Sequence, residues 1–464
     1  MSRPGSSPDE KGVSQNGDPG GHRPVFTNTL NAAVSPETRL LSAFARDTQA
    51  RKVDLAGRGR DKTTACFCRS KVTANILHRQ RQRIHEQHVQ KYYSEEGRPF
   101  ELRLVGKIKQ QLSTDPTLHP EYPSSLGLRE FTRKATEVAL GKHSRAIVEN
   151  RVLGVQTPGF TAAVRLGAEL LRCWYDPSAC WCGPVYLSSP CDDSLTGIFQ
   201  AAGIQEIREY YYWDDKQRGI CLERLLEDLE SAPEHSVVVL SASAHYPTGA
   251  DLSQSQWAVI TRLITRRRLF PFLLLPTQAL CCGDMERDAW PVQHCASLGM
   301  ELLCAQSFSH CFGLYGEAVG HLLCVLKQNS VLLPVRSQAD KIVRSLWARP
   351  SVGGAHVVTT VLSNSAHLVE WQGEVKHIVE RCMLIRAILR EKMRLLGTPG
   401  RWDHLTQQGG LFCCTGLNGE QVEFLSNRRR VYLLPGGCLN VSAINCRNLD
   451  YIAESIHLAL TSSL

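Results

Sequence analysis

The sequence lacks an apolar run long enough to cross a membrane. The longest run, Leu269–Cys282, is interrupted by prolines and falls short of the roughly 20 residues that a bilayer requires. No charged segment followed by an apolar stretch opens the chain. We therefore expect no secretory signal, a cytoplasmic location and reduced cysteines.

The 18 cysteines lack the spacing of a metal site. Zinc sites usually place cysteines in CxxC pairs. The close pairs of this chain are nearer together than that: Cys66/Cys68, Cys180/Cys182, Cys281/Cys282 and Cys413/Cys414. We therefore expect scattered core thiols and no metal site.

A signature of nucleic-acid recognition is missing as well. The chain carries a net charge of +8, and much of the basic excess lies in one stretch, Arg58–Lys109. A basic run of this kind is usually a solvated helix face, and no RNP, zinc-finger or recognition-helix motif accompanies it. Nucleic acid is therefore the least favoured class of partner.

What the chain does have is the composition of a globular protein, with 43% hydrophobic and 21% charged residues. From about Leu128, helical patterns alternate with short apolar runs that are typical of strands buried on both faces. The runs are Pro184–Pro190, Ser236–Ala244, Leu269–Pro276 and Glu301–Ser309. This alternation predicts an α/β fold with a mostly parallel sheet flanked by helices, followed by a smaller α+β unit.

Ligands of open parallel sheets bind beyond the carboxyl ends of the strands. The loops at that edge are SAHYPTG (243–249), LPTQAL (275–280) and SFSHCFG (307–313). We expect the functional site in these three loops.

Two of the loops carry motifs of a known family. AHYPTG (244–249) is similar to AHNPTG, and CAQSFSHCFGLYGEAVG (304–320) is similar to CAQSFSKNFGLYNERVG, of cytosolic aspartate aminotransferase. Five shorter strings agree in order and spacing: RDAW (287–290), KIVR (341–344), LGTPG (396–400), YLLP (432–435) and NLDY (448–451). The chain thus resembles the aspartate aminotransferases, which are fold-type-I pyridoxal-phosphate enzymes. A further string, GKHS…AIVENRV (141–152), resembles a divergent second paralogue of the cytosolic enzyme.

The resemblance implies a domain organisation. It extends from about Arg51 to Leu460 and is interrupted once. The expected parts are a flexible tail (1–35), a small domain (36–60 plus 378–464), and a large domain (61–377) with a poorly packed insertion at 62–97.

At seven positions, the resemblance implies that a side chain needed for transamination has been replaced. The reaction requires a lysine amine that forms a Schiff base with the cofactor aldehyde, and a carboxylate on the pyridine nitrogen. His310 stands at the lysine position and Leu274 at the carboxylate position. The other replacements concern the phenolic oxygen of the cofactor (Tyr246 and Thr277), its phosphate (Ala318), its ring face (Asp192) and the substrate α-carboxylate (Cys438).

Six other positions keep the side chain that the resemblance implies. They are Thr161, Ser307 and Ser309 beside the cofactor phosphate, His245 behind the pyridine ring, Tyr122 reaching a partner subunit, and Arg344 reading a substrate carboxylate across a homodimer. Each of these residues also has an ordinary structural explanation, such as a helix cap, an ion pair or a buried histidine.

Two functions stay open at this point. The first is a degenerate member of the family, a pseudoenzyme that acts as a homodimeric binding protein, with a dicarboxylic amino acid or oxo acid as a possible ligand. The second is an active pyridoxal-phosphate aminotransferase that transfers the amino group of aspartate to 2-oxoglutarate. The second requires an amine other than the imidazole of His310, which could act only as a general base.

Overall fold

In a computed structural model of the protein, the described residues are 36–49, 51–56, 91–118, 121–175, 181 and 183–462. The chain divides into two units, Met1–Ser35 and Pro36–Leu464, and all described residues belong to the second. The predicted tail lies outside the described residues, as does the predicted insertion up to residue 90.

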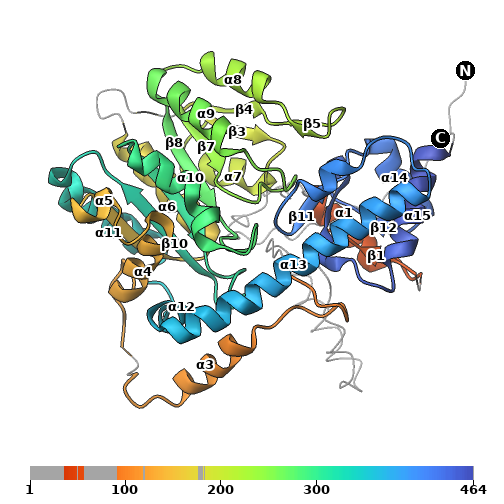
Figure 1. Cartoon of the computed structure of the whole chain (residues 1–464). Helices are drawn as coiled ribbons and strands as arrows, with labels where there is room; N and C mark the ends of the chain where they lie inside the picture. Colours follow the sequence, from red (N-terminus) through yellow and green to blue (C-terminus); the bar gives the residue numbers. More distant parts are fainter. Residues whose placement is uncertain are drawn as a thin grey trace, which may run out of the picture. The chain divides into compact units, whose positions relative to one another are not determined.

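A seven-stranded sheet forms the centre of the second unit (Figure 1). In spatial order, its strands are β2 (Val152–Pro158), β10 (Val319–Val325), β9 (Leu302–Ser307), β8 (Phe270–Leu275), β7 (Val237–Ser241), β3 (Val185–Ser189) and β4 (Ile207–Tyr211). Neighbouring strands run parallel except at β10, which is antiparallel to both β2 and β9. The predicted mostly parallel sheet is confirmed.

The four predicted apolar runs become β3, β7, β8 and β9. Every residue of β8 and β9 is buried, as expected for central strands covered on both faces. The sequence did not predict β2 or β10, because polar residues interrupt their apolar pattern. Gln156, Thr157 and His321 are all buried within these two strands.

Helices cover both faces of the sheet and define two hydrophobic clusters. The first cluster includes side chains of α4 (Arg129–Leu140), α8 (Leu222–Glu230), α9 (Gln254–Arg266), α10 (Met285–Ser297) and α12 (Gly353–Ser363). The second includes side chains of α6 (Phe160–Trp174), α7 (Asp193–Ala201) and α11 (Leu332–Leu346). These layers hold the strand ends, and therefore the loops of the predicted site, in place.

Side-chain caps set the start of several helices. Ser253 and Gln256 form a capping box at the start of α9, and the Asp284 side chain accepts two backbone N–H groups of α10. The helical pattern of Val369–Gly397 predicts a long helix, which the structure confirms as α13, Ser365–Leu395. The helix begins four residues before the predicted start because the Asn364 side chain caps it.

The C-terminal part of the chain forms short elements around two small sheets. They are β1 (Val53–Asp54) paired with β12 (Val431–Tyr432), β11 (Phe412–Cys414) paired with β13 (Cys438–Asn440), α14 (Gly419–Arg428) and α15 (Leu449–Thr461). The remaining elements are α1 (Pro36–Arg46), α3 (Arg103–Ser113), α5 (Arg145–Val148), β5 (Trp213–Asp214) and β6 (Gly219–Ile220). The pairing of β1 with β12 joins residues from both ends of the chain, but the proposed division into a large and a small domain remains a prediction.

One expectation about the insertion is wrong at its C-terminal end. Tyr92 and Tyr93 belong to the segment that we expected to pack poorly, yet both side chains are buried. Tyr93 and Pro99 form an isolated bridge, and the Tyr92 N–H donates to the hydroxyl of Tyr315. Among the helices of the described residues, none is long and apolar enough to cross a membrane.

Candidate functional site

The loop that connects β9 to β10 carries His310. Its Nδ1 lies 3.2 Å from the carbonyl oxygen of Pro276, the residue that follows β8. The ring of Tyr315, five residues further along the same loop, lies 6.3 Å from the imidazole, centroid to centroid. Burial lowers the pKa of His310 to about 4, so the imidazole is neutral at pH 7. The sequence prediction that His310 lies at the carboxyl edge of the sheet is confirmed.

Two buried hydroxyl groups at this edge have no hydrogen-bond partner among the described residues. Thr277 Oγ1 lies two residues beyond β8, and Ser243 Oγ lies two residues beyond the neighbouring strand β7. Both residues are 4% exposed. An unsatisfied buried hydroxyl costs about 1–3 kcal/mol, which makes both atoms candidates for a contact with a ligand. Ser243 begins one of the three loops in which the sequence predicts the site, but no motif singled out this residue.

Leu274 lies inside the central sheet rather than in a loop. It pairs with Ser241 of β7 and Ala305 of β9, and it is buried in the second hydrophobic cluster. A carboxylate at this position would require a partner for its charge. The apolar side chain needs none.

His245 is fully engaged in hydrogen bonds. Its Nδ1 lies 2.8 Å from Thr248 Oγ1, its Nε2 lies 2.9 Å from Ser188 Oγ, and its ring stacks on Tyr212 at 3.9 Å. Burial lowers its pKa to about 3. The neighbouring Tyr246 is half-buried and packs edge-on against Phe412. His245 therefore behaves as a satisfied core histidine in this structure.

A cluster of small polar groups lies where β10 meets the N-terminus of α6. Ser307 Oγ accepts the N–H of Ser309 at 3.2 Å, and Ser309 Oγ accepts the N–H of Val319 at 3.0 Å. Both hydroxyl hydrogens remain available to an anion. Thr161 is exposed in the first turn of α6, where the helix dipole favours negative charge.

Ala318 adjoins this cluster but adds no charge. A Cβ placed on Gly159, the residue that caps α6, would lie 3.5 Å from the Ala318 Cβ. Ala318 itself has a φ of 51°. The N-terminus of α6 thus meets a methyl group where the resemblance implies a guanidinium.

Asp192 performs a structural task. Its side chain accepts the Ser194 N–H at 2.9 Å and caps α7. A capping carboxylate cannot stack on a cofactor ring as an indole would.

Cys438 is buried in β13, directly opposite Cys414 of β11. The next pair along, Thr415 and Gly437, is hydrogen-bonded, because the Thr415 N–H donates to the Gly437 carbonyl at 3.1 Å. Hydrogen-bonded and non-hydrogen-bonded pairs alternate in antiparallel strands, so Cys414 and Cys438 form a non-hydrogen-bonded pair, whose side chains lie closer together. Contact with the Cys414 thiol, together with burial, raises the pKa of Cys438. The thiol is therefore neutral at pH 7 and cannot replace a guanidinium.

The two residues predicted to cross a dimer interface both lie on the surface of the single chain. Tyr122 is 87% exposed, and the guanidinium of Arg349 lies 4.9 Å from its ring centroid. Arg344 Nε lies 2.9 Å from Asp340 Oδ2, with 70% of the arginine side chain exposed. The interactions found for these two side chains, with Arg349 and Asp340, do not involve the His310 loop.

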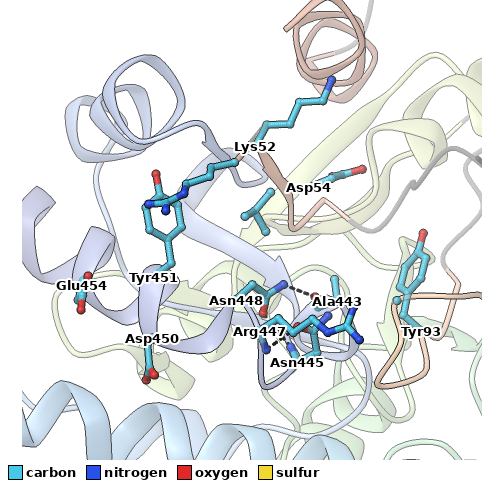
Figure 2. Close-up of a pocket in the computed structure, with 13 residues that line it drawn as sticks. Lys52, Asp54, Tyr93, Ala443, Asn445, Arg447, Asn448, Asp450, Tyr451 and Glu454 are labelled. Atoms are coloured by element: carbon cyan, nitrogen blue, oxygen red, sulfur yellow. Dashed lines mark hydrogen bonds between the residues drawn. The ribbon is translucent and has the colours of Figure 1, made fainter. Parts of the chain in front are cut away.

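A separate pocket of about 840 Å³ lies between β1 and the start of α15 (Figure 2). Arg447, Asp450 and Glu454 are among the residues that line it, so charges of both signs surround the space. No residue of the predicted site lines this pocket.

Comparisons with known proteins place the chain in a family. The family model for aminotransferase class I and II matches residues 98–456. The chain belongs to the class I and II aminotransferases.

Two curated members of the family illustrate the degree of similarity. The cytoplasmic aspartate aminotransferase of Gallus gallus is 44% identical over 370 residues, which cover 80% of this chain and 90% of the relative. The Homo sapiens protein named "Putative aspartate aminotransferase, cytoplasmic 2" is 38% identical over 365 residues, which cover 79% of this chain and 85% of the relative. The predicted likeness to the aspartate aminotransferases is confirmed.

Solved structures of other aminotransferases share the fold. The aromatic-amino-acid aminotransferase of Burkholderia pseudomallei, covalently bound to pyridoxal phosphate, is 28% identical with a TM-score of 0.83, covering 95% of this chain and 100% of that chain. The cytoplasmic aspartate aminotransferase of Saccharomyces cerevisiae is 27% identical with a TM-score of 0.81, covering 94% and 98%. The fold of this aminotransferase relative is therefore the predicted fold-type-I architecture.

Proposed function

We propose that this chain is an aspartate aminotransferase-like protein that does not catalyse transamination and instead acts as a homodimeric binding protein. The observation that carries the proposal is the position of His310. An imidazole, held by the Pro276 carbonyl, stands where the family resemblance implies a Schiff-base lysine. Imidazole has no primary amine and cannot form an imine with an aldehyde.

Pyridoxal phosphate is the cofactor that membership of the family implies, but the residues present do not fit its covalent and electronic requirements. Leu274 is buried among apolar side chains where a carboxylate would hold the pyridine nitrogen protonated. Ala318 offers no guanidinium to a phosphate.

The groups that remain support binding. The hydroxyl hydrogens of Ser307 and Ser309 and the N-terminus of α6 suit an anionic group, and the unpartnered hydroxyls of Thr277 and Ser243 can contact a ligand. The exposed Tyr122 and Arg344 are available to a second copy of the chain.

The test is to incubate the purified chain with pyridoxal phosphate, reduce it with borohydride and measure its intact mass. We expect no covalent adduct and no amino transfer from aspartate to 2-oxoglutarate. The Gallus gallus enzyme, treated identically, is the positive control. Substantial turnover by the unmodified chain would refute the proposal.

The second candidate is the active aspartate:2-oxoglutarate aminotransferase. It would need a different amine near His310, and one lysine of the chain, Lys91, lies beside the His310 loop. Peptide mapping of any borohydride-reduced adduct would identify the lysine involved. An adduct accompanied by turnover would favour this candidate.

A further inference from the structure

Lys91 lies beside the His310 loop, although no sequence pattern singles it out. Its Nζ is 5.9 Å from the ring centroid of Tyr315, and that ring is in turn 6.3 Å from the ring of His310. The Lys91 carbonyl accepts the side-chain N–H of Asn440 at 3.0 Å. Asn440 belongs to β13, the strand that begins with Cys438. Lys91 therefore joins the loop of His310 to the strand of Cys438.

The ammonium of Lys91 has no acidic partner among the described residues. Other lysines of the chain do form such ion pairs, for example Lys109 with Glu317 at 2.8 Å and Lys107 with Glu370 at 3.4 Å. The contact found for Lys91 is the face of the Tyr315 ring, and Lys91 itself is half-buried. An aromatic face attracts a cation but does not neutralise it. The charge remains available to an anion.

The one carboxylate within the His310 loop itself, Glu317, is already paired with Lys109 at 2.8 Å. Neutral His310 donates its Nδ1–H to the Pro276 carbonyl, so its Nε2 carries a lone pair and adds neither a charge nor a donor. Thr277 directly follows Pro276, and its buried hydroxyl lacks a partner among the described residues. The Tyr315 hydroxyl accepts the Tyr92 N–H, so its own hydrogen can still be donated. Donors and neutral groups together favour an anionic ligand.

We propose that Lys91 is the cation that binds the carboxylate of a small oxo acid or dicarboxylate at the His310 loop. The proposal rests on the proposed function, since it names the ligand class of that binding site. Lys91 supplies a positive charge next to the strand in which Cys438 supplies none. The serine hydroxyls and the α6 N-terminus, which suit a phosphate, belong to a different part of the site and do not include Lys91.

The experiment measures binding of succinate, 2-oxoglutarate and inorganic phosphate to the full chain by isothermal titration calorimetry. Three variants are compared with the wild type: Lys91→Met, Lys91→Arg and the control Lys327→Met. Lys327 donates to the Gly299 carbonyl and is exposed, away from the His310 loop. Thermal melts of the variants verify that each one folds.

We expect Lys91→Met to weaken binding of both carboxylates by about tenfold or more, as for loss of a charge-assisted hydrogen bond. Lys91→Arg keeps the charge, so its affinity for the carboxylates should stay within about threefold of that of the wild type. Lys327→Met should leave the carboxylate affinity unchanged. Added salt should weaken wild-type binding, because the contact is ionic.

Equal affinity in folded Lys91→Met and wild type would overturn the proposal, as would the absence of carboxylate binding. Binding of phosphate alone, dependent on Lys91, would also overturn it. If borohydride with 2-oxoglutarate left a covalent mass on Lys91, the lysine would act through an imine rather than an ion pair. None of these results depends on transaminase activity, so this proposal and the proposed function fail separately.

Discussion

The Nδ1 atom of His310 lies 3.2 Å from the carbonyl oxygen of Pro276, and this contact ties the β9–β10 loop to the end of β8. A lysine at the same position would have a longer, flexible side chain ending in a primary amine. The imidazole instead forms a short link between two loops at the carboxyl edge of the sheet. The side chain at position 310 thus supports local structure, and an isolated exchange of this residue would not rebuild a catalytic site.

Replacing His310 by lysine alone should not produce a transaminase. The new amine could form an imine, but Leu274, Ala318 and Cys438 would still lack the charges that the family resemblance implies. Losing a charge-assisted bond typically costs about 1.5–3 kcal/mol, and each 1.4 kcal/mol is about a tenfold change in rate. We expect turnover to remain several orders of magnitude below that of an active relative.

The matching experiment compares amino transfer from aspartate to 2-oxoglutarate in the parent, the single variant and a quadruple variant. The quadruple variant, with His310→Lys, Leu274→Asp, Ala318→Arg and Cys438→Arg, is the smallest set that we expect to show activity. Activity in the single variant would show that the three other positions matter less than their chemistry suggests.

Acidification should destabilise the fold through its buried histidines. Burial lowers the pKa of His245 to about 3 and that of His321 to about 3, whereas an unfolded histidine titrates near 6.5. The folded state holds both rings neutral, so their contribution to stability is present above pH 6.5 and is lost as the pH falls from 6.5 toward 3. Between pH 7 and pH 5, each ring should reduce the free energy of unfolding by about 2 kcal/mol.

Urea unfolding of the wild type and of His245→Gln at pH 7 and pH 5 measures this dependence. The variant should be less stable at pH 7, because it loses the bonds to Thr248 and Ser188. Its stability should, however, depend less on pH. An unchanged pH dependence in the variant would argue against a neutral, buried His245.

Asp192 should contribute to stability as a helix cap. Asp192→Ala removes the acceptor for the Ser194 N–H and should cost about 1 kcal/mol in the free energy of unfolding. Asp192→Asn keeps an accepting oxygen and should cost much less. Chemical denaturation measures the free energy of unfolding of both variants. A large loss of stability in the asparagine variant would show that the negative charge of Asp192, rather than its hydrogen bond to Ser194, stabilises α7.

The chain should form a homodimer at micromolar concentration. The family resemblance implies that Tyr122 and Arg344 cross a dimer interface, and both side chains are exposed in the single chain, Tyr122 at 87% with its ring against Arg349. Sedimentation velocity should give the dimer mass, and Tyr122→Ala should shift the equilibrium toward monomer. A wild-type chain that sediments only as a monomer would contradict the prediction.

The strands β8 and β9 could be predicted from the sequence because β8 is apolar throughout and β9 begins with four apolar residues, 302–305, as is typical of strands buried on both faces. The strands β2 and β10 could not be predicted in this way. Gln156 and His321 are buried in them, but polar residues of these types usually lie on the surface. Contacts distant in sequence satisfy part of their polar atoms: Gln156 donates to the Ser351 carbonyl at 2.7 Å, and His321 Nδ1 lies 2.8 Å from Gln306 Oε1. The buried Nε2 of His321 has no partner among the described residues.

The family, the class of fold and the identity of the replaced side chains can all be read from the amino-acid sequence, because they depend on motif strings and residue chemistry. What the replacements do depends on the three-dimensional structure: Asp192 caps α7, Cys438 faces Cys414, and His310 contacts the Pro276 carbonyl. The fold also brings Lys91 next to Tyr315, which lies 224 positions further along the chain. Contacts between residues so distant in sequence arise from the packing of separate elements, and no local pattern encodes them.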